Sequence, residues 1–210
     1  MAALVLVAAA DLWSIVSWVR AGDRLDGARD SARYATEAEL TLIGETVWFA
    51  GALHGLALVT AAFAFILWFR RVRENAGIFA PDLQRKGPGW SIGGWFIPIG
   101  MIWIPYGVAA DIWAASRRDP HAVTGRESRA LINVWWALWL ASIVGLQIAS
   151  DSYQEAGTIG EMRSAIREYM VSDALFVTAA VLAIMVVRAI TRMQLAKFPA
   201  RPEAAGERAV

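Results

Sequence analysis

The sequence predicts an all-α protein, a polytopic helical membrane bundle. Three observations predict this class: four stretches are apolar enough to cross a bilayer, 57% of the residues are hydrophobic with a mean hydropathy of +0.43, and only 19% are charged. These values lie far from those of soluble domains. A soluble chain with this composition would aggregate, so the lipid bilayer is the first partner that we expect.

Each of the four complete spans carries at most one histidine or charged side chain. In chain order they are residues 2–19 with Asp11, residues 47–69 with His54, residues 130–150 with none, and residues 169–187 with Asp173. At about 1.5 Å of rise per residue, segments of this length match a hydrocarbon core about 30 Å thick. We therefore expect four helices that cross the membrane.

A fifth segment, residues 90–116, is equally apolar but is interrupted by Pro98 and Pro105. Proline removes a backbone donor and clashes with the preceding turn, so the helix should be kinked or unwound between the two prolines. Such a break is tolerated at membrane depth only where the backbone is packed in protein or lines a cavity. The length of the segment favours a fifth crossing, and we place the ligand site at the break.

The lysine and arginine counts allow two orientations. With five spans and the N-terminus outside, thirteen basic residues lie inside and seven outside. If residues 90–116 only enter the bilayer and return, the N-terminus is inside and the counts become fourteen and six. Both arrangements satisfy the preference for basic residues on the cytoplasmic side, so the rule does not choose between them.

An internal repeat connects the two halves of the chain. Residues 58–70 and 176–188 align at an offset of 118, and both contain Val-Thr-Ala-Ala followed by an arginine in register. If the central segment crosses the membrane, the two repeats have opposite topology, as in many secondary transporters. Gene duplication without a mechanistic role is the alternative.

We interpret the chain as a single integral-membrane domain, residues 1–198. Helical hairpins at residues 1–76 and 130–195 flank the broken helix at residues 88–116. Residues 199–210, which contain Pro202 and small polar residues, are expected to be a disordered tail.

Carboxylates at membrane depth are the first candidates for chemistry, because each costs roughly 2.5–3.5 kcal/mol on insertion scales. The catalytic candidates are Asp111 late in the broken helix, Asp11 in the first span, and Glu45 just ahead of the second. An initiating acid must stay protonated, which requires burial without an arginine partner. The structural alternative for Asp111 is an ion pair with an arginine such as Arg118 or Arg20.

Two further titratable groups, Asp173 and His54, are secondary candidates for the acid. Asp173 lies near the start of the last span, where it is either functional or shallow enough to be wet. His54 is a candidate substrate-binding residue, with a hydrogen-bonded packing role as the alternative. Either becomes the next acid to test if the first three fail.

Eleven tryptophans in 210 residues suggest aromatic walls around a ligand. Trp18, Trp68 and Trp90 lie where interfacial belts are expected. The remaining aromatic candidates for substrate binding lie in the broken helix or inside the uncharged span, and they are Trp95, Trp103, Tyr106, Trp113, Trp135 and Trp139. A π-face stabilises a nearby cation by up to about 2 kcal/mol when water is excluded. Core packing or lipid contact is the alternative.

Several classes of function are disfavoured by composition. The chain has no cysteine, which excludes disulfides, thiolate-ligated zinc and iron–sulfur clusters. Its two histidines, His54 and His121, are too far apart in sequence to form a local metal motif, so we predict no metal and no cofactor. A net charge of +1 gives no electrostatic indication of nucleic-acid binding.

Three sequence motifs carry a resemblance. They are Trp68-Phe-Arg-Arg-Val-Arg-Glu-Asn-Ala, Pro88-Gly-Trp-Ser-Ile-Gly-Gly-Trp-Phe-Ile-Pro-Ile-Gly and Asp111-Ile-Trp-Ala-Ala-Ser. Over about residues 45 to 195 the chain resembles an actinobacterial family of small multi-span proteins filed as a domain of unknown function. Many members of that family carry a long Pro/Gly-rich tail that this chain lacks. In this it looks more like the small integral-membrane terpene cyclases of streptomycete indole-sesquiterpene and diketopiperazine-sesquiterpene pathways.

The resemblance implies a bacterial multi-pass protein of the plasma membrane and a metal-independent isomerase or lyase reaction. In that reaction an acid protonates a prenyl chain carried by a larger small-molecule acceptor, and the cation closes rings. The residue types fit, since a buried carboxylic acid serves as general acid and a dry cavity prevents early quenching. Asp111 and Trp113 belong to the general family motif, whereas Asp11 lies outside it and is the more diagnostic residue. The alternatives are a small membrane carrier and a non-enzymatic scaffold.

Overall fold

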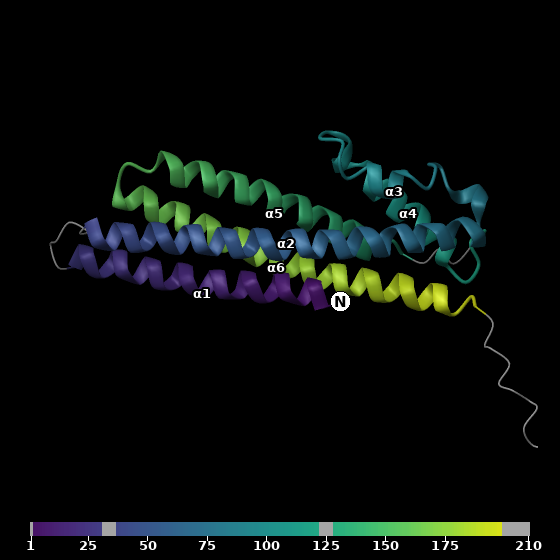
Figure 1. Ribbon diagram of the computed structural model, residues 1–210, viewed down its shortest axis with the longest axis horizontal. Helices are drawn as coiled ribbons and strands as arrows, with labels where there is room; N and C mark the ends of the chain where they lie inside the picture. Colours follow the sequence, from purple (N-terminus) through teal and green to yellow (C-terminus); the bar gives the residue numbers. More distant parts are fainter. Residues whose placement is uncertain (1, 31–36, 122–127, 199–210) are drawn as a thin grey trace, which may run out of the picture. The chain divides into compact units, whose positions relative to one another are not determined.

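The computed structural model describes residues 2–30, 37–121 and 128–198, and within these ranges all regular structure is helical (Figure 1). Four long helices account for most of it. In chain order the elements are α1 (Ala2–Asp30), α2 (Glu37–Phe79), η1 (Pro81–Leu83), α3 (Trp90–Gly93), η2 (Gly100–Ile102), α4 (Ile104–Ser116), α5 (Ala130–Glu155) and α6 (Ile159–Leu195). The predicted class, an all-α membrane bundle, is confirmed.

In the part of the chain that the structure describes, four helices are long and apolar enough to cross a membrane. The apolar stretches are Ala2–Asp23, Thr41–Phe79, Ala130–Glu155 and Ile159–Leu195. They contain the four complete spans that the sequence predicts. The helices are longer than the predicted spans because charged residues at their ends continue the helical hydrogen bonding beyond the hydrocarbon layer.

The fifth apolar segment does not form a spanning helix, so the prediction of about five spans is corrected to four. Residues 90–116 form the short helix α3, a run of turns, the 3-10 turn η2 and the 13-residue α4. At about 1.5 Å per residue, α4 is about 20 Å long and too short to cross. The predicted break between Pro98 and Pro105 is confirmed.

Glycines make the break compact. A Cβ atom on Gly94 would lie 2.6 Å from Cγ2 of Ile104, and one on Gly100 would lie 2.8 Å from Cδ1 of the same side chain. Both distances are shorter than real Cβ atoms adopt. The side chain of Ile104, the first residue of α4, can therefore pack against the preceding turns only because positions 94 and 100 are glycine. The second and third glycines of the Gly-Gly-Trp-Phe-x-Pro-x-Gly motif, Gly94 and Gly100, therefore have a packing role.

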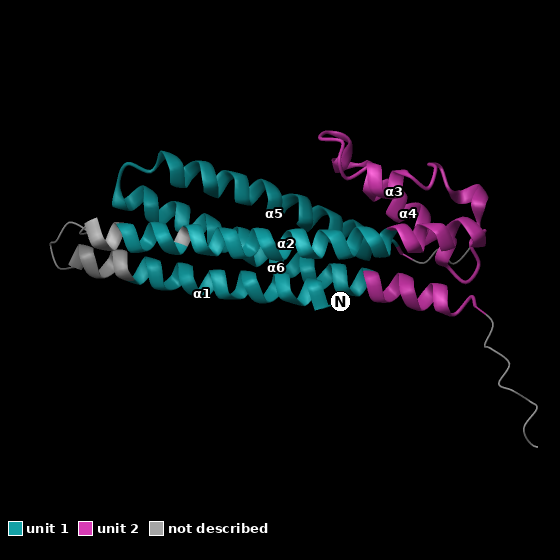
Figure 2. Cartoon of the chain, viewed as in Figure 1, with its two compact units in different colours: residues 1–69, 129–186 teal, residues 70–128, 187–210 magenta. Residues whose placement is uncertain are grey.

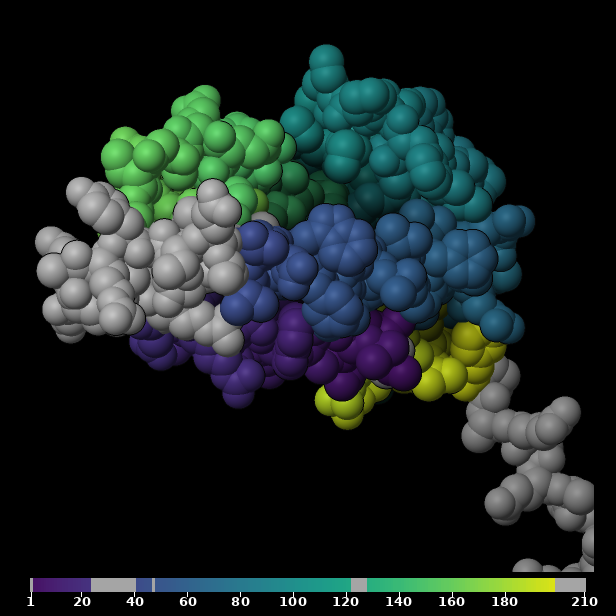
Figure 3. Space-filling view, turned by 60° about the vertical axis from the view of Figure 1, so that its left-hand side comes forward, coloured from purple at the N-terminus to yellow at the C-terminus, as the bar shows by residue number. Residues whose placement is uncertain are grey.

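The chain divides into two compact units (Figure 2). Unit 1 comprises residues 1–69 and 129–186, and unit 2 comprises residues 70–128 and 187–210. Unit 1 is a bundle of four helices in which α1 and α2 lie side by side, as the space-filling view also shows (Figure 3). Unit 2 contains η1, α3, η2 and α4 with the ends of α2 and α6.

The two hairpins of unit 1 have the same topology, which corrects the prediction of opposite topology. In Figure 1, α1 and α5 run in one direction and α2 and α6 run in the other. The inverted arrangement required the central segment to cross the membrane, and it does not. The repeat itself is reproduced in detail, because Thr60 and Thr178 each donate a 2.8 Å hydrogen bond to the carbonyl four residues earlier. Parallel repeats of this kind are known in membrane transporters.

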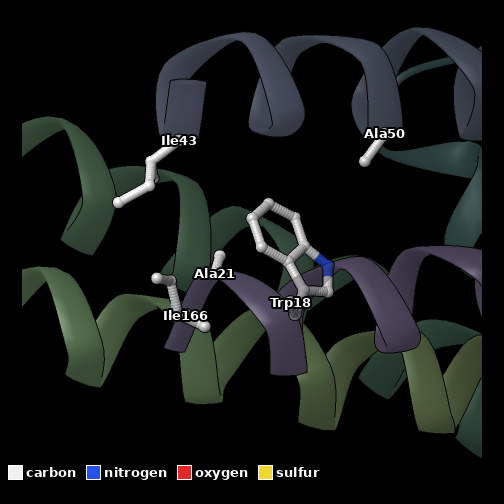
Figure 4. Packing of buried hydrophobic residues seen from close by; sticks show 5 residues of the cluster. All are labelled: Trp18, Ala21, Ile43, Ala50 and Ile166. Atoms are coloured by element: carbon white, nitrogen blue, oxygen red, sulfur yellow. The ribbon is translucent and has the colours of Figure 1, made fainter. Parts of the chain in front are cut away.

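Trp18 is at the centre of a packed cluster in unit 1. Its side chain lies between α1, α2 and α6, with Ile43 and Ala50 across from it (Figure 4). Trp18 is only 3% exposed, so its predicted place in an interfacial belt is wrong. Small residues such as Ala21 and Ala50 let the helices approach closely, as is common where helices pack in lipid.

Unit 2 has a polar interior. Gln194, which is buried, donates from Nε2 to the Val72 carbonyl at 2.9 Å and to Ser116 Oγ at 3.1 Å. Asn75 Nδ2 donates to Gln194 Oε1 at 2.9 Å. Arg73, also buried, donates to the Lys86 carbonyl at 2.6 Å. The bonds of Gln194 connect the end of α6 to α2 and α4, and the Arg73 bond connects α2 to the loop that contains Lys86. They satisfy polar groups that would be costly to leave unpaired.

Candidate functional site

Three titratable side chains from three helices meet inside unit 1. Asp11 comes from α1, His54 from α2 and Asp173 from α6, and one candidate ligand atom from each lies within 4.8 Å of the others. Their exposed fractions are 0%, 8% and 5%. Two carboxylates and an imidazole at membrane depth are expensive to bury, so this cluster is the candidate functional site.

Asp11 and His54 form its closest pair. His54 Nδ1 and Asp11 Oδ1 are 2.5 Å apart, a separation typical of a strong, charge-assisted hydrogen bond that contains one proton. No arginine or lysine forms an ion pair with either residue in the described parts of the chain. The Phe176 ring packs edge-on against His54, with 4.7 Å between ring centroids. The pair is therefore held in an apolar setting without a permanent cation.

Asp173 is positioned by Trp18. The indole Nε1–H donates to Asp173 Oδ2 at 2.9 Å, and Tyr169 stacks on the indole at 4.8 Å between ring centroids. The charged groups that act on Asp173 are Asp11 and His54. Trp18 thus fixes the second carboxylate next to the pair.

Two atoms of the pair are open to further bonding. Asp11 Oδ2 and His54 Nε2 are buried and have no hydrogen-bond partner within the described residues. A buried unpaired polar atom costs about 1–3 kcal/mol, so its retention suggests a use. The three side chains have the residue types of a cation site. Asp11 and His54, however, bond directly to each other, and such a bond needs a proton between the two side chains. We therefore treat them as a cluster that holds and exchanges protons.

A pocket of about 850 Å³ lies on the same hairpin, between α1 and α2. Its volume is in the range of small-molecule sites. It is lined by Trp13, Ser17, Arg20, Ala21, Leu42, Gly44, Glu45, Thr46, Trp48 and Phe49. Phe49 precedes His54 by five residues, about 7.5 Å along α2, and Trp13 is two residues after Asp11. Along the helices these two residues are within about one and a half turns of the pair, but helical spacing turns them about 160° and 140° away from Asp11 and His54. The pocket is therefore on the same hairpin as the pair but on other faces of α1 and α2.

Asp111 lies elsewhere, in unit 2, and has the arginine partner that an initiating acid must lack. Its Oδ1 accepts from Arg85 Nε at 2.8 Å and its Oδ2 accepts from the Arg85 backbone N–H at 3.2 Å. Arg118 and Arg20, the partners considered from the sequence, are not the ones used. Asp111 thus anchors the loop that follows η1 to α4, and we no longer assign it as the acid.

The aromatic candidates do not line the pocket described above. Trp95, Trp103, Tyr106 and Trp113 belong to unit 2, where Trp103 is exposed and Trp113 is buried. In unit 1, Trp135 packs against Phe65 at 5.6 Å between centroids, and a chain of ring contacts continues through Trp136 to Trp139. This is core packing, the alternative considered from the sequence.

Three predicted residues do fall at the site: Asp11 and His54 form the pair, and Glu45 lines the pocket. Trp13, Trp48 and Phe49, which line the pocket, were not predicted from the sequence. Helical spacing offered one signal for Trp18, which is seven residues after Asp11 and so lies on the same face of α1. The pairing with Asp173 is a tertiary contact, for which the sequence has no signal.

The second hairpin lacks an equivalent pair. At the offset of the repeat, the position of His54 is occupied by Ser172, whose Oγ donates to the Ser142 carbonyl on α5 at 3.1 Å. The Asp11–His54 pair is therefore formed by the first hairpin alone, and the second hairpin contributes Asp173 to the cluster.

Residues 29–192 match the family model described as Domain of unknown function (DUF4328). The chain belongs to this family. The match includes His54 and Asp173 and excludes Asp11 and Trp18, which precede it. No curated protein and no solved structure matches the chain.

Proposed function

We propose that the protein is a membrane-bound terpene cyclase that protonates and cyclises the prenyl chain of a larger acceptor molecule without a metal. The single observation that supports this most is the buried Asp11–His54 pair, which has no arginine partner among the described residues and is formed by the same hairpin as an aromatic pocket. A proton shared between a carboxyl group and an imidazole in an apolar setting is suited to general acid catalysis.

The reaction begins when the pair transfers one proton to a carbon of a prenyl double bond. The π electrons form the new C–H bond, and a carbocation is left on the neighbouring carbon. Attack by the next double bond closes a ring and moves the positive charge along the chain. Loss of a proton from the last cation restores a double bond, so the net reaction is an isomerisation.

The pocket supplies the remaining requirements. Trp13, Trp48 and Phe49 present π-faces that stabilise positive charge, by up to about 2 kcal/mol for each well-placed ring in the absence of water. These rings are 41–73% exposed in the protein itself, so the exclusion of water that would quench the cation is completed by the acyl chains of the bilayer. Glu45 and Arg20 provide the polar groups on the pocket wall that orient the acceptor part of the substrate.

The test is incubation of the detergent-purified protein with prenylated indoles and prenylated cyclic dipeptides. The expected product has the mass of the substrate and a different chromatographic retention. Asp11→Asn should lower its formation by about 10²–10⁴-fold, the usual contribution of a general acid, while Asp23→Asn, an exposed change on the same helix, should have no effect. Absence of product from the wild-type protein with every substrate would refute the proposal.

A proton-coupled carrier is the second candidate, favoured by the titratable cluster at membrane depth and by the parallel repeat of hairpins. In liposomes with an imposed pH gradient, a carrier would move protons together with a solute, whereas a cyclase would not. A protein that neither forms product nor moves protons would be a scaffold.

A further inference from the structure

Each cycle of a proton-initiated reaction leaves the acid one proton short, because the last cation releases its proton elsewhere. Asp11 is fully buried and His54 nearly so, so neither regains a proton by direct contact with water. The side chains that connect the pair to the end of the bundle therefore determine the rate at which the pair is reprotonated, and so the rate of repeated turnover.

Among the described residues, titratable side chains continue from the pair along α6 and α5. Asp173 is the next group, with a candidate ligand atom within 4.8 Å of Asp11 and His54. One helical turn nearer the α5–α6 connection is Tyr169, whose ring stacks on Trp18 and whose electrostatic neighbours are Ser150, Asp173 and Asp151. Asp151 is exposed.

The positions along the helices are consistent with a continuous line. Asp173 is 14 residues from the start of α6, a depth of about 21 Å, and Tyr169 is ten residues from it, a depth of about 15 Å. Ser150 and Asp151 lie in the last turns of α5. The Tyr153 ring, 6.2 Å from the Tyr169 ring between centroids, borders the same line.

We infer that Asp173 and Tyr169 form the route by which protons from the α5–α6 end of the bundle reload the Asp11–His54 pair. This rests on the proposed function for the identity of the reaction, but not for the existence of the route. A proton moves from the Asp173 carboxyl to the pair, and Asp173 regains one from water through the Tyr169 hydroxyl. Trp18 is the positioning residue, because its N–H holds Asp173 in place.

Two conservative variants remove the proton-carrying groups and keep the packing. Asp173→Asn retains an oxygen that accepts from Trp18, and Tyr169→Phe retains the ring that stacks on it. Asp23→Asn is the matched control on α1. All three full-length proteins are purified in the same detergent.

The experiment measures the first turnover and the steady state separately. With enzyme in excess, Tyr169→Phe, a change outside the cluster, should convert the first equivalent of substrate within about twofold of wild type, because the pair is already loaded. With substrate in excess, the turnover of both variants should fall at least about tenfold, since proton transfer by a positioned side chain contributes that much or more. Equal losses in both phases for Tyr169→Phe would overturn the route.

Rapid-mixing infrared spectroscopy after a pH jump tests the route without any substrate. The carboxyl band that Asp11→Asn removes should appear at least about tenfold more slowly in both variants than in wild type. Unchanged band kinetics would overturn the inference, even where product formation supports the cyclase. If the wild-type protein forms no product but the carboxyl band is slowed in both variants, the cyclase is refuted and the route is supported.

Discussion

Asp111→Asn is the change that best separates a structural carboxylate from a catalytic one. Asp111 is buried and both of its oxygens accept hydrogen bonds from Arg85. It is also the carboxylate that acts electrostatically on Arg73, which is buried as well. The variant is isosteric, so its effect reports hydrogen bonding and charge.

The magnitude follows from what the amide cannot do. Whichever way it is turned, its NH₂ group faces an N–H of Arg85 and leaves that donor unpaired, at a cost of about 1–3 kcal/mol. Loss of the ion pair adds at most about 1 kcal/mol, because the Arg85 side chain is 67% exposed and screened by solvent. We expect a total loss of about 1–4 kcal/mol in the free energy of unfolding.

Unfolding in detergent, with hydrogen exchange of the amides of residues 84–90, measures this loss. Arg85→Gln is the control: it keeps the backbone bond to Asp111 Oδ2 and should cost about 1 kcal/mol or less. At a temperature where Asp111→Asn is still folded, product formation should be unchanged. Unaltered stability together with abolished product formation would refute the structural role of Asp111 and identify it as the catalytic acid.

Two further predictions concern single hydrogen bonds. Trp18→Phe keeps a ring for Tyr169 to stack on but removes the bond to Asp173, so unfolding should be easier by about 1–3 kcal/mol and steady-state turnover slower; unchanged stability would show that the bond is not made. The His121 imidazole, 2.8 Å from Asp82, holds the pKa of that carboxyl below its usual range. The stability from this pair is therefore present at neutral pH and lost as the pH falls through the lowered Asp82 pKa. His121→Gln should raise that pKa in a carboxyl NMR titration, and an unmoved midpoint would contradict the assignment.

The sequence predicted the membrane helices well, because their signal is local. Long apolar runs with one titratable residue each are enough to identify α1, α2, α5 and α6. Whether residues 90–116 cross was not decided by composition, since a crossing and a folded-back segment are equally apolar. The outcome depends on how the glycines and Ile104 pack, which is a tertiary property.

The candidate site was predicted only in part for a similar reason. Asp11 and His54 were identified by their cost in lipid, which is a property of each residue alone. That they contact each other, and that Asp111 contacts Arg85, depends on which helices are neighbours. The sequence does not decide whether a tryptophan inside an apolar span lines a cavity or packs in the core, as Trp135 does against Phe65.

The most direct test of the account is product formation by Asp11→Asn alongside its stability. We expect the variant to fold as well as wild type or better, because it replaces a buried ionisable group. We expect the amount of cyclised product in the first turnover to fall by about 10²–10⁴-fold. A stable Asp11→Asn protein that forms product at the wild-type rate would contradict the central claim that the Asp11–His54 pair delivers the initiating proton.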